Sequence, residues 1–189
     1  MLYVAIEVAV YVWMPTYLQA YRGQGSDLAP YALTAFFTLR AAGRFLGAWT
    51  LKRFSWSAVV ALFSGVICAC FAGSLWGGPA TGVYLLPLSG LFMSVMYPTL
   101  NSKGISCFDR NEHGSVAGLI LFFTATAAAA GPLAMAAVSD AYGDAKYGFV
   151  LASGLALILF VALLLNLLLK PAERRLQTLD RGEYASEAG

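Results

Sequence analysis

The sequence predicts an all-α integral membrane protein with six transmembrane helices, and three observations support that class. Hydrophobic residues make up 59% of the 189 residues and charged residues only 12%, whereas a soluble domain carries about 25% charged residues. The apolar residues gather into runs of about 20, the length at which a helix crosses a bilayer. Short connections, several of which contain glycine, separate these runs.

Six apolar runs define the expected helices, and a polar tail follows them. The runs cover residues 1–20, 29–50, 56–76, 80–102, 114–138 and 147–169, so that 1–169 forms one transmembrane bundle and 170–189 a tail. The chain begins without a polar lead-in, and Glu7 interrupts the first run. A secretory signal peptide starts with positive charge and continues with an uninterrupted apolar stretch. We therefore expect the first helix to begin at or inside the membrane.

The distribution of Lys and Arg between the connections sets the expected orientation. If the first helix runs outward from the cytoplasm, the cytoplasmic connections and the tail hold eight of these residues and the outer connections two. The eight are Lys52, Arg53, Lys103, Arg110, Lys170, Arg174, Arg175 and Arg181, and the two are Arg22 and Lys146. This bias predicts a multi-pass protein of the plasma or inner membrane with both termini in the cytoplasm.

Composition and motif content argue against several functional classes. The net charge of +2 is too small to indicate a nucleic-acid partner. The sequence contains no dinucleotide-binding glycine motif, P-loop or zinc-type Cys/His spacing, so we expect neither a cofactor nor a metal. Cys68 and Cys70 do not share a helix face, which favours a packing role. His113 has no nucleophile or second ligand nearby in sequence, so an intramembrane enzyme is not expected.

Two ionisable residues within the apolar runs are expected to meet. An arginine at the centre of a membrane helix costs about 2.5–3.5 kcal/mol on insertion scales, so it calls for a partner or a function. Glu7 lies 13 residues before the expected outer end of the first helix, and Arg40 lies 12 residues after the outer start of the second. At 1.5 Å per residue, both lie about 18–20 Å below the outer surface. We predict an ion pair, with either a structural or a gating role.

Arg44 lies one turn deeper than Arg40, and its side chain is expected to extend toward the inner surface. The pair Glu7 and Arg40, together with Arg44, forms the set of candidate gating residues.

Polar and aromatic residues at helical spacing mark candidate solute-binding positions. Tyr3, Glu7 and Tyr11 form one stripe on the first helix, and Ser94, Tyr97 and Asn101 share a face of the fourth. The prolines at 87 and 98 predict a bent or broken helix, a feature that often lines a transport site. Interhelical hydrogen bonding is an equally good interpretation of these polar residues. The full candidate set is Glu7, Tyr11, Thr34, Ser94, Tyr97, Asn101 and Thr124.

Three segments resemble a known family. Residues 43–54 (Gly-Arg-Phe-Leu-Gly-Ala-Trp-Thr-Leu-Lys-Arg-Phe) resemble the motif that joins the second and third helices of each half of major facilitator transporters. Residues 90–99 look like the fourth helix of the fucose–galactose–glucose proton symporter (L-fucose permease-like) group, and 114–140 are similar to the fifth helix of a carboxyl-terminal half. Lys52 and Ser55 depart from the loop motif, where aspartate and glycine are common.

The resemblance implies one half-bundle of a major facilitator fold, equivalent to helices seven to twelve of a twelve-helix protein. In that family the first, second, fourth and fifth helices of each half line a central site, and the third and sixth lie outside. The polar stripes of this chain fall on the same four helices, while 56–76 is nearly featureless and 147–169 is uniformly apolar apart from Asn166.

We therefore expect a secondary active transporter, or its carboxyl-terminal half, that moves a sugar or another small polar solute together with protons by alternating access. Its expected partners are the solute, the lipid bilayer and either a second six-helix half or a homodimer partner. The alternative is a truncated or split-gene membrane fragment without transport activity of its own, which acts only with a partner bundle.

Overall fold

The computed structural model describes residues 2–19, 21–23 and 25–187, and every regular element in these ranges is helical. The helices of the bundle are α1 (Leu2–Leu18), α2 (Ala32–Arg53), α3 (Trp56–Trp76), α4 (Pro79–Met93), α5 (Met96–Ser106), α6 (His113–Tyr142) and α7 (Ala145–Leu169). Two short 3₁₀ turns, Ser26–Tyr31 and Arg110–Glu112, precede α2 and α6, and α8 (Pro171–Glu187) follows α7.

Four helical stretches in the described part are long and apolar enough to cross a membrane. They are Trp56–Trp76, Pro79–Ser106, Arg110–Tyr142 and Ala145–Leu169. The helix α1 is apolar but has only 17 described residues. The helix α2 has 22 residues but carries four cations, two inside its sequence and two in its last turn. The expected six spans therefore remain a prediction at these two helices.

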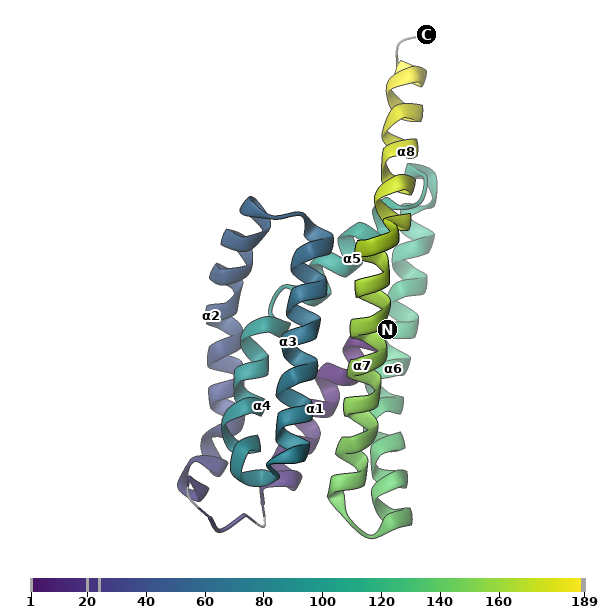
Figure 1. Ribbon diagram of the computed structural model, residues 1–189. Helices are drawn as coiled ribbons and strands as arrows, with labels where there is room; N and C mark the ends of the chain where they lie inside the picture. Colours follow the sequence, from purple (N-terminus) through teal and green to yellow (C-terminus); the bar gives the residue numbers. More distant parts are fainter. Residues whose placement is uncertain (1, 20, 24, 188–189) are drawn as a thin grey trace.

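The run 80–102, which the sequence predicts to be bent or broken, is divided into α4 and α5. Ser94 and Val95 lie between the two helices, and Pro98 follows within the first turn of α5. A proline donates no backbone hydrogen bond, and its ring clashes with the carbonyl group four residues earlier, which here belongs to Ser94. The break lets α5 run obliquely across the bundle toward α6 (Figure 1).

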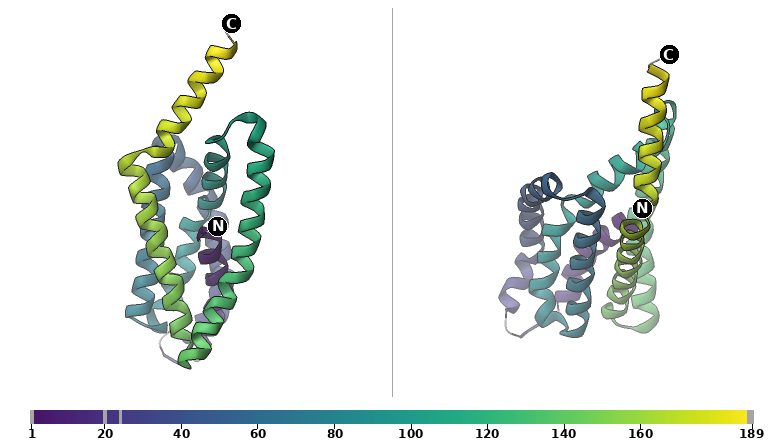
Figure 2. Two further views of the ribbon diagram at one scale, coloured as in Figure 1. Left: turned by 90° about the vertical axis from the view of Figure 1, so that its right-hand side faces the viewer. Right: turned by 45° about the horizontal axis from the view of Figure 1, so that its top comes forward.

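Residues 171–187 of the expected polar tail form the helix α8. The helix begins at Pro171, a residue that is well suited to the first helical position. Lys170 joins α7 to α8 with a left-handed backbone (φ 53°), and its N–H donates to the Asn166 carbonyl oxygen. The helix leaves the bundle at the end where α5 meets α6 and points away from it (Figure 2).

The helix α1 is the best-buried element of the bundle. Eleven of its 17 residues are buried, and it contacts α6, α7, α4 and α2. Around it, α2 packs against α4, α4 against α3, α3 against α7, and α7 against α6. The three largest fully buried side chains, Phe36, Phe71 and Phe149, come from α2, α3 and α7. This arrangement surrounds the polar side chains of α1 with other helices.

The helices α2 and α4 approach each other so closely that only glycine fits at the contact. A Cβ atom on Gly90 would lie 2.6 Å from the Phe36 carbonyl oxygen, and one on Gly43 would overlap the Leu91 carbonyl oxygen. Gly47 likewise faces the Val95 side chain. Two glycines of the 43–54 motif therefore serve helix packing, in the way small residues do at transmembrane interfaces.

Hydrogen bonds join neighbouring helices at each of the two ends of the bundle. At one end, the Trp13 indole donates to the Ala145 carbonyl oxygen (2.9 Å) and the Tyr17 hydroxyl to that of Ser74 (3.0 Å). At the other end, the buried Ser57 hydroxyl donates to the Glu173 carboxylate (2.5 Å). The guanidinium of Arg175 donates to the Cys107 carbonyl oxygen (3.4 Å). The start of α8 therefore contacts both α3 and the connection between α5 and α6.

The close contact between α2 and α4 can be tested with Gly43→Ala and Gly90→Ala. Each added methyl group must displace a backbone carbonyl, so each variant should lose about 1–3 kcal/mol of unfolding free energy. Thermal unfolding in detergent, followed by circular dichroism, measures the loss. Gly118→Ala is the matched control because nothing lies within 4 Å of its Cβ position. Equal losses in the control and the two variants would show that the contact is not tight.

The attachment of α8 can be tested with Glu173→Ala. Removing the acceptor of the Ser57 hydroxyl should speed amide hydrogen exchange in the first turns of α8, because a short helix without tertiary contacts is marginal in water. Hydrogen-exchange mass spectrometry of the tail peptides measures this rate. Arg174→Ala changes an exposed neighbour and should leave the rate unchanged. Unaltered exchange in Glu173→Ala would contradict the docking contact.

Candidate functional site

The Glu7 carboxylate and the Arg40 guanidinium form an ion pair between α1 and α2. The Glu7 side chain is 9% exposed and the Arg40 side chain 24% exposed. This is the contact that the depth estimate predicts. In a low dielectric the Coulomb attraction between two charges is stronger than at a surface. The free-energy cost of leaving one of them without a partner is also higher, so breaking this pair is more costly than breaking a surface pair.

One turn before Glu7, Tyr3 ties α1 to the break between α4 and α5. The Tyr3 hydroxyl donates to the Met93 carbonyl oxygen at 2.7 Å, and Tyr3 is 3% exposed. Met93 is the last residue of α4, where the helical ladder is interrupted. The tyrosine hydroxyl thus gives a hydrogen bond to a backbone carbonyl group beside the break. In membrane proteins, side chains of neighbouring helices commonly form hydrogen bonds with backbone groups that a helix break leaves free.

A small cavity lies next to this contact, between α1, α5 and α6. Its volume is about 170 Å³. It is lined by Tyr3, Val4, Tyr97, Leu100, Asn101, Ile120 and Thr124. We call it the Thr124 cavity. The Oγ1 atom of Thr124 is buried and has no hydrogen-bond partner among the residues that the structure describes. A buried hydroxyl without a partner carries a desolvation cost and is suited to bind a polar group that enters the cavity.

The other candidate solute-binding residues lie outside the Thr124 cavity. Ser94 shares the predicted face of Tyr97 and Asn101, but it lies at the break, and its hydroxyl donates to the Leu91 carbonyl oxygen (2.9 Å). Tyr11 packs its ring beside Phe37, with 6.0 Å between ring centroids. Thr34 is exposed on α2. Glu7, paired with Arg40, does not line the cavity either. The structure therefore brings Tyr97, Asn101 and Thr124 together and leaves the other four candidates outside the cavity.

Arg44 lines a second hollow, which sequence reasoning missed. This groove has a volume of about 600 Å³ and lies between α2, the start of α3 and α5. Its lining consists of Arg44, Ala48, Leu51, Trp56, Val95, Pro98, Thr99, Ser102 and Lys103. We call it the basic groove, because its lining contains two cations and no acid. The sequence showed Thr99 and Lys103 four residues apart on one helix face, but nothing in it placed that face beside Arg44.

Near the groove, burial raises the pKa of the Cys107 thiol, and the charges of Arg175 and Lys103 oppose that shift. The thiol is therefore protonated at neutral pH and is a poor nucleophile. Among the described residues, no group of three or more His, Cys, Asp or Glu side chains could hold a metal ion.

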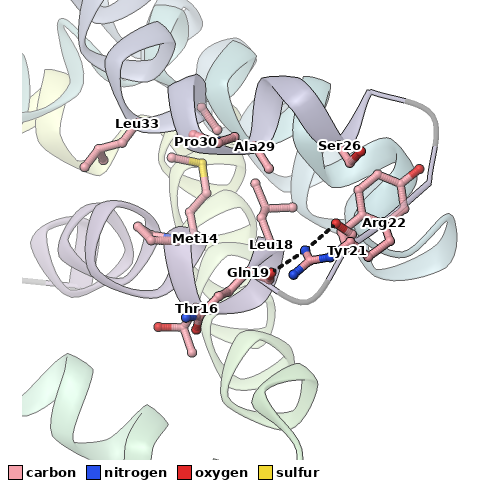
Figure 3. Close-up of a pocket in the computed structure, with 12 residues that line it drawn as sticks. Met14, Thr16, Leu18, Gln19, Tyr21, Arg22, Ser26, Ala29, Pro30 and Leu33 are labelled. Atoms are coloured by element: carbon pink, nitrogen blue, oxygen red, sulfur yellow. Dashed lines mark hydrogen bonds between the residues drawn. The ribbon is translucent and has the colours of Figure 1, made fainter.

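A third hollow, of about 490 Å³, lies at the opposite end of the bundle and contains none of the predicted site residues. Figure 3 shows its wall, formed by the end of α1, the following connection and the turn before α2. The Arg22 guanidinium donates to the carbonyl oxygens of Gln19 (3.0 Å) and Tyr21 (3.1 Å). These bonds join Arg22 to the backbone of its own connection, so its guanidinium helps to shape this wall.

Two crystal structures of the transporter FucP share this fold. A variant of the Escherichia coli fucose:proton symporter superposes with a TM-score of 0.74 over 86% of this chain and 39% of its own, at 24% identity. The major facilitator transporter FucP in the outward conformation superposes with a TM-score of 0.72, at the same identity and coverage. At this identity the likeness is one of fold.

Sequence comparison identifies the family. The chain is 31% identical over 104 residues to the L-fucose-proton symporter of Escherichia coli strain K12, a match that covers 54% of this chain and 24% of that relative. The chain therefore spans well under half the length of the relatives it matches. The family model for the Major Facilitator Superfamily matches residues 1–186. Together with the helical bundle and its apolar spans, this match shows that the chain is a membrane protein of the Major Facilitator Superfamily, a family of transporters rather than enzymes.

Proposed function

We propose that this chain is the carboxyl-terminal half of a proton-coupled permease for a sugar or a similarly small polar solute. It works by alternating access together with a second six-helix bundle, in the orientation that places both termini in the cytoplasm. The observation that carries the proposal is the Thr124 cavity, in which a buried, unpartnered hydroxyl lies beside a helix break and close along α1 to the Glu7–Arg40 ion pair.

The lining of the Thr124 cavity supports a solute with hydroxyl groups. Asn101 can both donate and accept hydrogen bonds, and Thr124 offers a free hydroxyl. Tyr3 and Tyr97 add ring faces, which suit the apolar faces of a sugar ring. The similarity to an L-fucose-proton symporter is consistent with this solute class.

The position of Glu7 supports coupling to protons. Among the described residues of the bundle helices α1 to α7, Glu7 is the one buried acid. Neutralising it would release Arg40 and loosen the contact between α1 and α2. Because Tyr3 and Glu7 lie one turn apart, a shift of α1 would also reach the Met93 carbonyl and the cavity wall. Proton uptake and solute binding would then act on the same helix.

The exposed surface of α6 supports a partner bundle. Only Thr124 and Met135 of its 30 residues are buried. Large apolar side chains such as Leu121, Phe122 and Leu133 are exposed on it. The match to well under half of its relatives' length points the same way. A homodimer would cover the same surface with a second copy.

Uptake of a sugar panel into vesicles tests the proposal. The chain is reconstituted alone and together with a co-expressed second six-helix bundle, with and without an inward proton gradient. Gradient-driven uptake that needs both bundles is expected. Uptake by the chain alone would exclude the requirement for a different second bundle and would leave a second copy of this chain as the partner. Absence of uptake in both arms would favour a membrane fragment without transport activity.

Single and double replacements of the Glu7–Arg40 pair distinguish an effect on proton coupling from an effect on the stability of the bundle. Glu7→Gln should abolish stimulation of uptake by the proton gradient and should destabilise the bundle, because it leaves Arg40 without its partner. Breaking a buried pair costs about 3–5 kcal/mol, and the partial exposure of Arg40 places the expected loss at or below that range. The double variant Glu7→Gln/Arg40→Gln should regain stability but not coupling. Normal gradient dependence in Glu7→Gln would remove Glu7 from the mechanism.

Thr124→Val should affect stability and solute affinity in opposite directions. Removing a buried, unpartnered hydroxyl relieves a desolvation cost of about 1–3 kcal/mol, so the melting temperature should stay the same or rise. Losing one hydrogen bond to the solute should raise the KM for uptake about two- to tenfold. Thr126→Val is the control, because the Thr126 hydroxyl is exposed and already donates to the Phe122 carbonyl oxygen. An unchanged KM in Thr124→Val would place the solute elsewhere.

A further inference from the structure

The basic groove contains two cations whose charge is not balanced by any acid in its lining. Arg44 projects from α2 and Lys103 from α5, and both line the same hollow. Neither side chain has a carboxylate partner among the residues that the structure describes. Arg40, one turn away on the same helix, is paired with Glu7. A cation on a membrane helix is unfavourable without a partner, so Arg44 and Lys103 favour an anion that comes from outside the chain.

The rest of the lining combines hydrogen-bond donors with apolar surface. Thr99 and Ser102 add two hydroxyl groups beside the cations. Leu51, Trp56 and Val95 provide an apolar surface next to them. A phosphate ester is bound well by paired cations and hydroxyls, and the apolar part suits the glycerol and acyl chains attached to it. A free phosphate ion would use the polar half of the lining but gain nothing from the apolar half.

The groove also lies at the end of the bundle that the distribution of Lys and Arg predicts to face the cytoplasmic headgroups. It is at the end of the bundle that carries Lys52 and Arg53 in the last turn of α2. A tryptophan in the lining is typical of the interface between headgroups and hydrocarbon. The groove has a volume of about 600 Å³. Its lining residues come from three helices, so the two cations do not simply belong to one charged turn of a single helix.

We propose that the basic groove binds the headgroup of an anionic phospholipid, with Arg44 and Lys103 neutralising the phosphate and Thr99 and Ser102 donating to its oxygens. The bound lipid occupies the space between α2 and α5 and supplies the counter-charge that the described residues do not place there. This site is separate from the Thr124 cavity and does not depend on the solute or on the coupling ion.

Native mass spectrometry of the detergent-purified chain tests the proposal. The chain is titrated with dioctanoyl phosphatidylglycerol, dioctanoyl phosphatidylcholine and inorganic phosphate. Phosphatidylglycerol should bind more tightly than phosphatidylcholine, and inorganic phosphate should displace it poorly. Arg44→Gln/Lys103→Gln should weaken phosphatidylglycerol binding about tenfold or more, since each basic residue adds substantially to the attraction of an anionic lipid.

Lys52→Gln/Arg53→Gln is the matched control, because it removes the same charge from the same end of the bundle but outside the lining. It should weaken binding far less, and Arg44→Lys should retain most of the affinity. Equal affinity for the two lipids would overturn the proposal, and this comparison uses the native chain and needs no variant. An equal loss in the control pair, or displacement by phosphate at equal concentration, would overturn it too.

Discussion

The need to neutralise Arg40 inside an apolar bundle constrains the rest of the structure. Its side chain is three-quarters buried and reaches the Glu7 side chain, which is more buried still. That contact sets where α1 lies along α2. The position of α1 in turn brings Tyr3 within 2.7 Å of the Met93 carbonyl oxygen and makes it part of the cavity wall. The position of α1 relative to α2 therefore determines three features together: the Glu7–Arg40 ion pair, the hydrogen bond to the Met93 carbonyl oxygen and the wall of the Thr124 cavity.

The second constraint is the glycine contact between α2 and α4. Gly43 and Gly47 let α2 lie against the Leu91 carbonyl and Val95, at the point where α4 is about to break. Arg44 lies between these two glycines in sequence, so its side chain leaves the packed face and enters the basic groove. The glycines of the 43–54 motif thus allow close helix packing, and its Arg44 places a cation in the basic groove. The departure of Lys52 and Ser55 from the family pattern leaves both functions intact.

Sequence analysis predicted a helical bundle and the contact between Glu7 and Arg40, because apolar length and helical rise can be read from the sequence alone. It also brought Tyr97, Asn101 and Thr124 into one candidate set. It placed Ser94 on the face of Tyr97 and Asn101, but the break between α4 and α5 turns that residue away. The prolines predicted a broken helix, and only the three-dimensional structure located the break at Ser94–Val95. Lys103 was missed because its proximity to Arg44 depends on the tilt of α5.

Because α8 is attached to the bundle at its first turn, its far end moves when the bundle tilts. The helix begins at Pro171, directly after Lys170. It is held to α3 through Ser57 and Glu173 and projects away from the bundle (Figure 1). Its 17 residues extend about 25 Å at 1.5 Å per residue. A rotation of the bundle by about 10° would therefore move the far end of α8 by about 4 Å. Small tilts of the transmembrane helices are thereby converted into displacements that distance measurements between labels resolve.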